Sequence, residues 1–309
     1  MKTILKSFFI LLCTGLLTVS CTDNDSMSDA QAALVELIHS AENLIATTEE
    51  GVELGNIAPG SKDALQARID QAYFIMDNTD REEAYTNAAE LLQAAIDAFN
   101  SNIVKAGIPH FGLGSKMNLG PASQWGLEDA FTIEMRIRCT EFASGDQNVI
   151  SCESSNGGCM IRNNDNQLQF YINNGGWAGG TVLTMELNRW YHIAATYEAG
   201  GDMNFYVDGD LVSTVANCGT MVASTTDLQA GTAPSYNDRY WRGDIQNVSI
   251  WEDVRTADEV AADVACDFAG TEDGLMAYWP LDLNAGTSIT DETGNHVAEL
   301  SDVTWIDVD

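Results

Sequence analysis

The chain of 309 residues is poor in positive charge. It contains 14 lysine and arginine residues against 46 aspartate and glutamate residues, and its formal net charge at pH 7 is −32. Binding to phosphate groups needs clustered Lys and Arg side chains. The composition therefore argues against nucleic acid, and against any other polyanion, as a ligand. An acidic excess of this size keeps a protein soluble.

Long hydrophobic runs are also scarce. The apolar run from Phe8 to Val19 follows the basic start Met1-Lys2-Thr-Ile-Leu-Lys6. It is too short to span a bilayer comfortably and is typical of a secretory signal peptide, which we place at 1–20. No other segment of the sequence is long and apolar enough to cross a membrane. Removal of 1–20 would take away two lysines and no acidic residue, so the mature chain would be more acidic still.

The signal peptide is followed at once by a cysteine. Leu17-Thr-Val-Ser-Cys21 resembles the lipobox of bacterial lipoproteins. The resemblance implies lipidation of Cys21 and a membrane anchor, because each buried CH₂ group of an acyl chain contributes about 0.8 kcal/mol. An ordinary signal peptide with a chance cysteine is the alternative. The acidic linker 21–27 resembles the export tag of Bacteroidota-type lipoproteins, which implies exposure on the outer membrane, although a solvated linker has the same composition.

Residues 28–105 have apolar side chains at every third or fourth position, which predicts amphipathic helices. Ser61 is the expected N-cap of the second helix, and Thr79 with Glu82 fits a capping box at the start of the third. Three helices of this length form a small bundle. The segment has no cluster of catalytic or metal-binding residues, so we interpret it as a spacer, with docking of a protein as the alternative.

Residues 108–309 show short stretches of alternating apolar and polar residues. In Phe131 to Arg138, for example, every second residue is apolar, which predicts a half-buried strand. Asp208-Gly209 is a hairpin signal, since both residues tolerate a positive φ. Many short strands without long intervening helices predict a mainly β fold, a β-sandwich preceded by the small α-helical bundle.

Several motifs in this region occur in a familiar order. They are Trp190-Tyr-His-Ile-Ala-Ala-Thr-Tyr197 with Phe205-Tyr-Val-Asp-Gly209, then Trp241-Arg-Gly-Asp-Ile-Gln-Asn-Val-Ser-Ile-Trp251, then Gly274-Leu-Met-Ala-Tyr-Trp279 with Asp291-Glu-Thr-Gly-Asn295. Together they resemble the concanavalin A-like, laminin G-type jelly roll. The resemblance implies two facing antiparallel sheets, in a fold whose members often bind sugars and sometimes proteins. Function has to be argued from a site, because fold alone does not decide it.

The sequence lacks the usual motifs of catalysis. Glycosidases need two carboxyl groups at a fixed separation, and the Glu-x-Asp-x-x-Glu or Glu-x-Asp-x-Glu run of glucanases that resemble this fold is absent. Glu134 is alone on its strand, with Arg136 and Arg138 two and four residues later, a pattern that is expected to make cross-strand ion pairs. His192 is expected to be hydrogen-bonded within the sandwich. Nucleophile elbows, zinc-type histidine pairs and phosphate loops are missing too, so we predict a non-catalytic protein.

Binding of a neutral sugar needs flat aromatic faces together with amides or carboxylates for the hydroxyl groups. Trp177 lies among glycines, where it is either exposed or folded back over the core. In the loop 236–241, Trp241 is expected in the core and the two tyrosines at the surface, while Gln167, Gln169 and Tyr171 share one face of a strand. The predicted sugar ligands are Trp177, Tyr171, Gln169, Tyr236, Asn237, Asp238, Arg239 and Tyr240.

No metal site is predicted. Calcium prefers six to eight oxygen ligands, and Asp244, Asp291 and Asn295 lie in turn-rich motifs where such residues usually bond to their own backbone. Structural calcium is the alternative. Five cysteines follow Cys21, so at least one is unpaired; they are Cys139, Cys152, Cys159, Cys218 and Cys266. Cys152 and Cys159 could close a hairpin, or they are small buried residues with no bond between them.

The sequence thus predicts a lipid-anchored cell-surface protein whose helical spacer carries a lectin-like jelly roll. The predicted ligand is a neutral oligosaccharide or polysaccharide, and no cofactor is expected. One alternative is a protein-binding adhesion or structural module of a glycan-uptake complex. The other is a glycoside hydrolase with scattered carboxylates.

Overall fold

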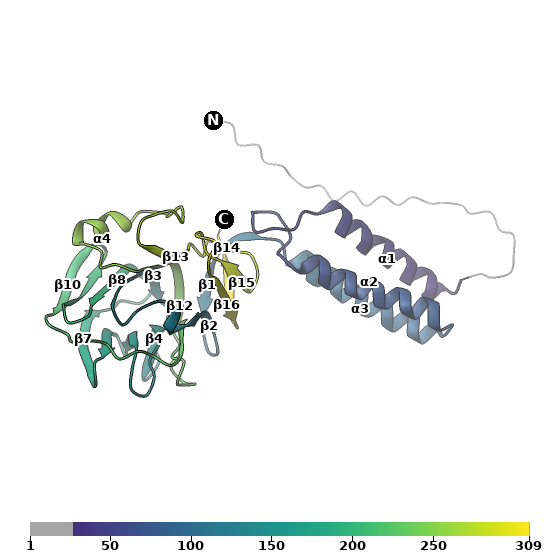
Figure 1. Ribbon diagram of the computed structural model, residues 1–309. Helices are drawn as coiled ribbons and strands as arrows, with labels where there is room; N and C mark the ends of the chain where they lie inside the picture. Colours follow the sequence, from purple (N-terminus) through teal and green to yellow (C-terminus); the bar gives the residue numbers. More distant parts are fainter. Residues whose placement is uncertain (1–26, 309) are drawn as a thin grey trace.

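The computed structural model describes residues 27–308. Three helices come first, α1 (Asp29–Thr47), α2 (Ser61–Asn78) and α3 (Glu82–Ser101), and they form a bundle to one side of a β-sandwich (Figure 1). The predicted signal peptide, Cys21 and the linker up to residue 26 lie outside the described residues. None of the helices within 27–308 has the length and apolar character needed to cross a membrane.

The bundle is held together by the apolar stripes of its three helices. The side chains that form its core are Leu34, Ile38, Ala41, Ile57, Leu65, Ile69, Ala72, Tyr85, Ala88, Leu92, Ile96 and Phe99. Both predicted helix starts were wrong. The N-cap of α2 is Gly60, because Ser61 is the first helical residue and its Oγ accepts a hydrogen bond from Asn102 (3.1 Å). Thr79 ends α2 and therefore cannot cap α3, whose N-cap is Arg81.

All strands of the described chain pair antiparallel and form two sheets. The nine-stranded sheet has the order β10 (Asp210–Val215), β9 (Met203–Val207), β8 (Trp190–Glu198), β3 (Ala130–Cys139), β12 (Gly243–Trp251), β1 (Lys105–Phe111) and β14 (Leu283–Asn284), with β13 (Leu275–Trp279) beside β12 and β17 (Thr304–Asp307) beside β1. The eight-stranded sheet has the order β15 (Ser288–Thr290), β16 (Val297–Ser301), β2 (Lys116–Pro121), β11 (Asp227–Ala230), β4 (Asp146–Ser151), β5 (Cys159–Asn164), β6 (Gln167–Asn173) and β7 (Trp177–Thr184). Two short helical segments, a 3₁₀ turn (Ala122–Gln124) and α4 (Ala257–Asp263), complete the domain.

The two sheets pack face to face over an aromatic core. Phe170 of the eight-stranded sheet contacts both Phe131 and Phe205 of the nine-stranded sheet, with ring centroids 6.4 and 5.9 Å apart. Such offset aromatic pairs stabilise a core beyond the burial of their area. Trp241 is fully buried in the same core, as predicted. The predicted mainly β fold, a sandwich of two antiparallel sheets preceded by a small helical bundle, is thereby confirmed.

The first half of strand β3, residues 131–135, is buried on both faces, whereas its alternating pattern predicted a half-buried strand. Arg136 and Arg138 in the second half are partly exposed, as that pattern predicted. The segment that leads into α4 covers the outer face of the first half, and the Thr132 hydroxyl donates to the carbonyl oxygen of Asp253 (2.8 Å). Glu134 lies under the same cover. Its carboxylate approaches His192 Nε2 on the neighbouring strand β8 (3.1 Å) and Arg255 Nε (3.5 Å). The expected cross-strand contact of Glu134 is thus made with His192, which is bonded within the sandwich as expected.

The bundle joins the sandwich through a packed junction. Ala58 of the loop after α1 contacts Val104 and Ala285 in a small buried cluster. The N–H groups of Gly55 and Ala58 donate to the carbonyl oxygens of Val104 (3.0 Å) and Asn102 (2.9 Å). These bonds fix the chain between α3 and β1, so the bundle and the sandwich are connected by a packed and hydrogen-bonded junction.

Candidate functional site

One face of the eight-stranded sheet is turned away from the core, and we call it the solvent face. There Arg162 of β5 lies opposite Gln169 of β6, and Tyr171 of β6 lies opposite Gly179 of β7. Trp177 shares this face because it lies two residues before Gly179 in the same strand. It is 41% exposed, so it belongs to the surface and does not close over the core.

A loop between β11 and β12, residues 231–241, crosses the solvent face, and we call it the aromatic loop. Its ends are joined by the hydrogen bond from Trp241 N to the carbonyl oxygen of Gly231 (2.9 Å). The N–H of Asn148, on β4, donates to the carbonyl oxygen of Arg239 (3.1 Å). Buried Trp241 anchors the loop in the core, while Tyr236 is 48% exposed. The loop is thus held at its base and presents its tip to solvent.

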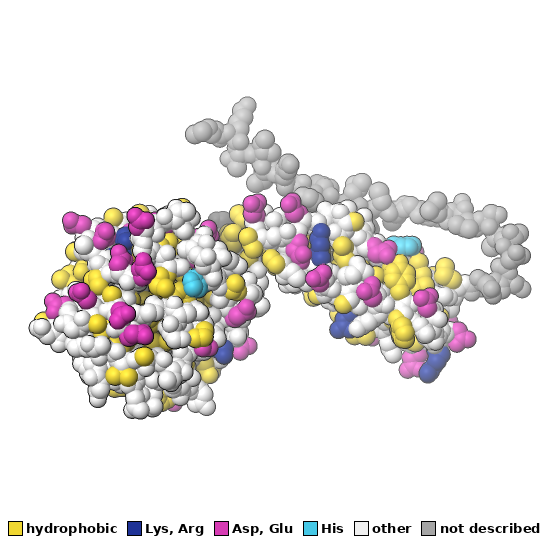
Figure 2. Space-filling view, in the orientation of Figure 1, with side chains coloured by type: hydrophobic (Ala, Val, Ile, Leu, Met, Phe, Trp, Pro, Cys, Tyr) yellow, Lys and Arg dark blue, Asp and Glu magenta, His cyan; other side chains and the backbone are white. Residues whose placement is uncertain are grey.

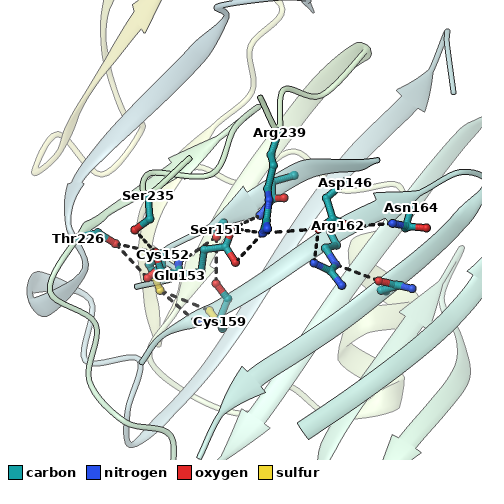
Figure 3. Close-up of polar contacts among 12 residues, drawn as sticks. Asp146, Ser151, Cys152, Glu153, Cys159, Arg162, Asn164, Thr226, Ser235 and Arg239 are labelled. Carbon is teal, nitrogen blue, oxygen red and sulfur yellow. Dashed lines mark hydrogen bonds and ion pairs between the residues drawn. The ribbon is translucent and has the colours of Figure 1, made fainter. Parts of the chain in front are cut away.

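Two arginines and two carboxylates connect the aromatic loop to the sheet (Figure 3). Arg239 Nη1 lies 3.1 Å from Glu153 Oε1 and 3.6 Å from Asp146 Oδ2. Arg162 Nη1 lies 2.6 Å from the same Asp146 oxygen, and Arg162 Nε donates to Gln169 Oε1 (2.9 Å). We call these four charged residues the Arg–acid network. Its charges cancel, so it offers no excess charge to a ligand.

The Arg–acid network also positions two tyrosine rings. The guanidinium carbon of Arg239 lies 3.5 Å from the centroid of Tyr236, and that of Arg162 lies 5.3 Å from the centroid of Tyr171. Stacking of this kind contributes about 0.5–1 kcal/mol at exposed sites. Burial raises the pKa of the Glu153 carboxyl, and the neighbouring Arg239 and Arg162 counteract part of that rise. The arginines therefore hold both the acids and the aromatic faces in place.

A polar pocket of about 470 Å³ lies beside the aromatic loop. It is lined by two tyrosines and by amide, hydroxyl, amine and carboxylate groups, from Tyr236, Tyr240, Gln229, Thr232, Lys116 and Asp302. These are the donors and acceptors that sugar hydroxyls require. A groove of about 370 Å³ between α2 and α3 is lined mainly by apolar side chains such as Phe74, Ile75 and Leu91, so it offers fewer such groups.

The predicted sugar ligands come from two chain segments that meet on the solvent face. Gln169 and Tyr171 lie on β6 and Trp177 on β7, while Tyr236, Arg239 and Tyr240 belong to the aromatic loop. Asn237 and Asp238 are exposed at the tip of that loop.

Sequence reasoning missed the groups that complete this surface, namely Asp146, Glu153 and Arg162 in the network and Lys116 and Gln229 in the pocket. The available signal for the network was the position of Arg162 and Asn164 at every second residue of β5, which puts both polar side chains on one face of the strand. Lys116 and Gln229 could not have been placed together, because the pairing of β2 with β11 is long-range.

The two aspartates weighed for calcium, Asp244 and Asp291, are engaged by protein donors. Asp244 pairs through one oxygen with His110 Nδ1 (2.7 Å) and through the other with Arg138 Nε (2.5 Å). Asp291 accepts backbone N–H bonds from Thr293 (2.9 Å) and Asn295 (3.0 Å), the turn role that the sequence favoured. Across residues 27–308, no three His, Cys, Asp or Glu side chains gather as metal ligands. These residues therefore do not fit a calcium site.

Part of the sandwich is similar to a known family. Residues 111–261 match the family model described as the concanavalin A-like lectin/glucanases superfamily. This segment runs from the end of β1 into α4, so it includes the aromatic loop and strands β2 to β12. None of the curated proteins compared with the chain matches it.

This chain is similar to several solved structures over part of its length. A Bacteroides ovatus ATCC 8483 protein described as a "putative carbohydrate binding protein" is 19% identical, with a TM-score of 0.54 over 67% of this chain and 61% of that one. This chain therefore spans less than two thirds of that protein. A module of the Ruminococcus gnavus IT-sialidase, CBM40 bound to α2,3 sialyllactose, is 13% identical, with a TM-score of 0.43 over 53% of this chain and 98% of that one. Domain 4 of a Geobacillus stearothermophilus arabinanase in complex with arabinotriose is 14% identical, with a TM-score of 0.42 over 53% and 87%.

Proposed function

We propose that the protein binds a neutral carbohydrate on the solvent face of the eight-stranded sheet, at the aromatic loop. The observation that carries the proposal is the polar pocket in which Tyr236 and Tyr240 stand beside amide, hydroxyl and charged groups. Tyrosine rings suit the C–H faces of a sugar, and the polar groups suit its hydroxyls. The B. ovatus protein of similar fold, whose description names carbohydrate binding, supports the proposal.

The charge distribution supports a neutral sugar over an acidic one. The chain carries a net charge of −32, and acidic side chains are spread over both the sandwich and the bundle in the visible face (Figure 2). An anionic ligand would be repelled on approach. The arginines nearest the loop, Arg162 and Arg239, are already paired with Asp146 and Glu153, so they are not available to neutralise a ligand.

The geometry also favours binding without large rearrangement. Arg239 stacks on Tyr236 and holds it in one orientation, and the aromatic loop is closed at its base by the bond between Trp241 and Gly231. Immobilising a free side chain on binding costs about 0.5–1.5 kcal/mol. A ring that is already held avoids much of this cost.

A glycan array with the chain from Thr22 onward tests the proposal. We expect hits among neutral glycans, with affinities that fall about tenfold in Tyr236→Ala and Tyr240→Ala, equivalent to about 1.4 kcal/mol each. Tyr73→Ala is a matched control, because Tyr73 is also an exposed tyrosine but lies on the bundle. Absence of neutral-glycan binding would refute the proposal and favour the protein-adhesion alternative. Glycan affinities of Tyr236→Ala and Tyr240→Ala that equal the affinity of Tyr73→Ala would refute the site.

We further propose that the site binds without hydrolysing. A glycosidase needs two carboxyl groups at a fixed separation, one of which carries a proton to donate. Among the pocket-lining residues only Asp302 has a carboxyl group, and the acids of the neighbouring Arg–acid network, Asp146 and Glu153, are both paired with arginine. Incubation with any glycan found on the array should release no new reducing ends. Steady release that Glu153→Gln abolishes would instead establish a glycosidase.

Membrane attachment through Cys21 is part of the same proposal, with the helical bundle as the spacer between the anchor and the sandwich. The lipobox-like motif supports it, and the packed junction at Ala58 and Val104 gives the spacer a fixed connection to the sandwich. In a bacterial host, radiolabelled fatty acid should enter the protein and intact cells should bind an antibody against the sandwich. Label that persists in Cys21→Ala would contradict the anchor.

A further inference from the structure

Two cysteines face one another next to the Arg–acid network. Cys152 follows β4 and Cys159 begins β5, and their sulfur atoms are 3.7 Å apart (Figure 3). The backbone N–H of Cys152 donates to the carbonyl oxygen of Cys159 (3.0 Å), so the two residues are opposite one another in the hairpin. Both side chains are buried.

The turn between them is built to keep the two sulfurs together. Gly158 has a φ of 90°, and a side chain there would collide with the carbonyl oxygen of Cys152. A side chain at Gly157 would collide with the carbonyl oxygen of Ala223. The Ser224 hydroxyl donates to the carbonyl oxygen of Cys152 (2.5 Å), which clamps the hairpin from the neighbouring segment. The short distance between the two sulfur atoms is therefore set by a turn that is closely packed and hydrogen-bonded.

The environment distinguishes the two thiols chemically. Cys152 Sγ accepts a hydrogen bond from the backbone N–H of Cys159 (3.4 Å) and shares a second one with the Cys159 thiol. The second of these contacts is the main cause of a lowered pKa at Cys152 and of a raised pKa at Cys159. The thiolate is the attacking species in thiol–disulfide exchange. Cys152 is thus the nucleophile of the pair.

The hairpin is also connected to the proposed binding site. Glu153, the residue after Cys152, accepts a hydrogen bond on its carbonyl oxygen from the Ser235 hydroxyl (2.9 Å) and holds Arg239 through its carboxylate (3.1 Å). Ser235 and Arg239 both belong to the aromatic loop. A bond that restrains Cys152 therefore also restrains the next residue, Glu153, whose contacts position this loop.

We propose that Cys152 and Cys159 form a disulfide as the exported chain folds, and that this bond restrains the aromatic loop through Glu153. The oxidant is a disulfide of a thiol oxidase or carrier in the export compartment. The Cys152 thiolate attacks one sulfur of that disulfide, and the other sulfur leaves as a thiolate. The Cys159 thiolate then attacks the Cys152 sulfur and releases the oxidant as a dithiol. The chain loses two protons and two electrons, and the oxidant gains them.

Peptide mapping of the full-length protein, exported through its own leader, tests the bond itself. A protease that cleaves after acidic residues cuts the chain after Asp146 and after Glu153. Cys152 and Cys159 are then on separate peptides, and Cys139 is on a third. We expect a linked pair from Gln147–Glu153 and Ser154–Asp165 that separates on reduction and is absent in Cys159→Ala. Quantitative alkylation of both cysteines in the unreduced, denatured protein would overturn the proposal.

Hydrogen exchange tests the restraint of the loop, and it needs no ligand. The amides of 231–241 should exchange several-fold faster after reduction of the native protein, with no such response in the double variant Cys152→Ala/Cys159→Ala. Cys218→Ala, another buried cysteine, should keep the response. A linked pair with unchanged exchange in the loop would overturn the restraint alone. The importance of this restraint for glycan binding rests on the proposed function. Peptide mapping and hydrogen exchange do not depend on glycan binding.

Discussion

Arg239 contacts Tyr236 and Glu153 at the same time, with its guanidinium carbon 3.5 Å from the ring centroid and its Nη1 atom 3.1 Å from the carboxylate. One side chain thus links an exposed aromatic face to a buried acid. The two contacts depend on different properties of arginine, since the planar guanidinium stacks while its N–H groups bond in the plane. A lysine can reproduce the charge but not both contacts.

Replacement of Arg239 should therefore affect stability and binding together. In Arg239→Ala, Glu153 keeps a buried carboxylate without its main partner, which costs about 1–3 kcal/mol. Tyr236 also loses its support, so glycan affinity should fall at least as much as in Tyr236→Ala. Urea unfolding and calorimetric titration measure the two effects. Arg68→Ala, on the bundle, is the control, and equal behaviour of the two variants would show that the Arg239 contacts are unimportant.

Trp177 should matter for long ligands and not for short ones. It lies on β7, three strands from β4, over which the aromatic loop crosses. At about 4.8 Å between neighbouring strands, the separation is about 14 Å, which is longer than one sugar ring.

Trp177→Ala should thus weaken binding of oligosaccharides about tenfold and leave binding of the monosaccharide unit unchanged, as measured by titration with a series of chain lengths. Trp177→Phe, which keeps an aromatic face, should retain most of the affinity. A loss that is equal at every chain length would place Trp177 outside an extended site.

Stability should depend on pH through Glu134. Burial is the main cause that raises its pKa from 4.5 to about 6, with a smaller contribution from Asp263 and an opposing one from His192. Because the folded state binds the proton more tightly, the free energy of unfolding falls as the pH rises from about 4.5 through 6. A shift of this size corresponds to about 2 kcal/mol.

Urea unfolding from pH 4 to pH 7 measures this dependence. Glu134→Gln keeps the shape of the side chain and removes its titration, so the difference in unfolding free energy between wild type and variant should change by about 2 kcal/mol over that range. Glu90→Gln, an exposed glutamate of the bundle, controls for the general effect of removing a negative charge. Parallel curves for wild type and Glu134→Gln would mean that the buried carboxyl does not titrate in this range.

The fold was more predictable than the site, for a physical reason. Apolar periodicity records which face of an element is buried, and it located the helices and strands such as Phe131–Arg138. It does not record what covers the polar face. The segment over β3 buries Glu134 beside His192 and Arg255, and nothing near Glu134 in the sequence indicates those partners.

The same limit applies to the proposed binding surface. Composition singled out Trp177 and the tyrosines of the aromatic loop, because aromatic residues among glycines and polar residues are unusual. Asp146, Glu153 and Arg162 are ordinary surface types in the sequence. They become a network only when the hairpin of β4 and β5 is placed beneath the loop, a long-range arrangement that local patterns do not encode.

Two adjacent glycines of β7 give a sharp test of how Trp177 is positioned. Gly179 has a φ of 135°, and a Cβ atom there would collide with the carbonyl oxygen of Phe170 on β6, whereas a Cβ atom at Gly180 would meet nothing within 4 Å. Gly179→Ala should therefore push β7 away from β6 and cost about 1–3 kcal/mol, and it should lower the affinity for long glycans in the way that Trp177→Ala does. Gly180→Ala should change the unfolding free energy by less than about 0.5 kcal/mol. Thermal unfolding and titration with oligosaccharides measure stability and affinity in both variants. Equal losses of stability and affinity at the two positions would mean that the close approach of β7 to β6 does not position Trp177.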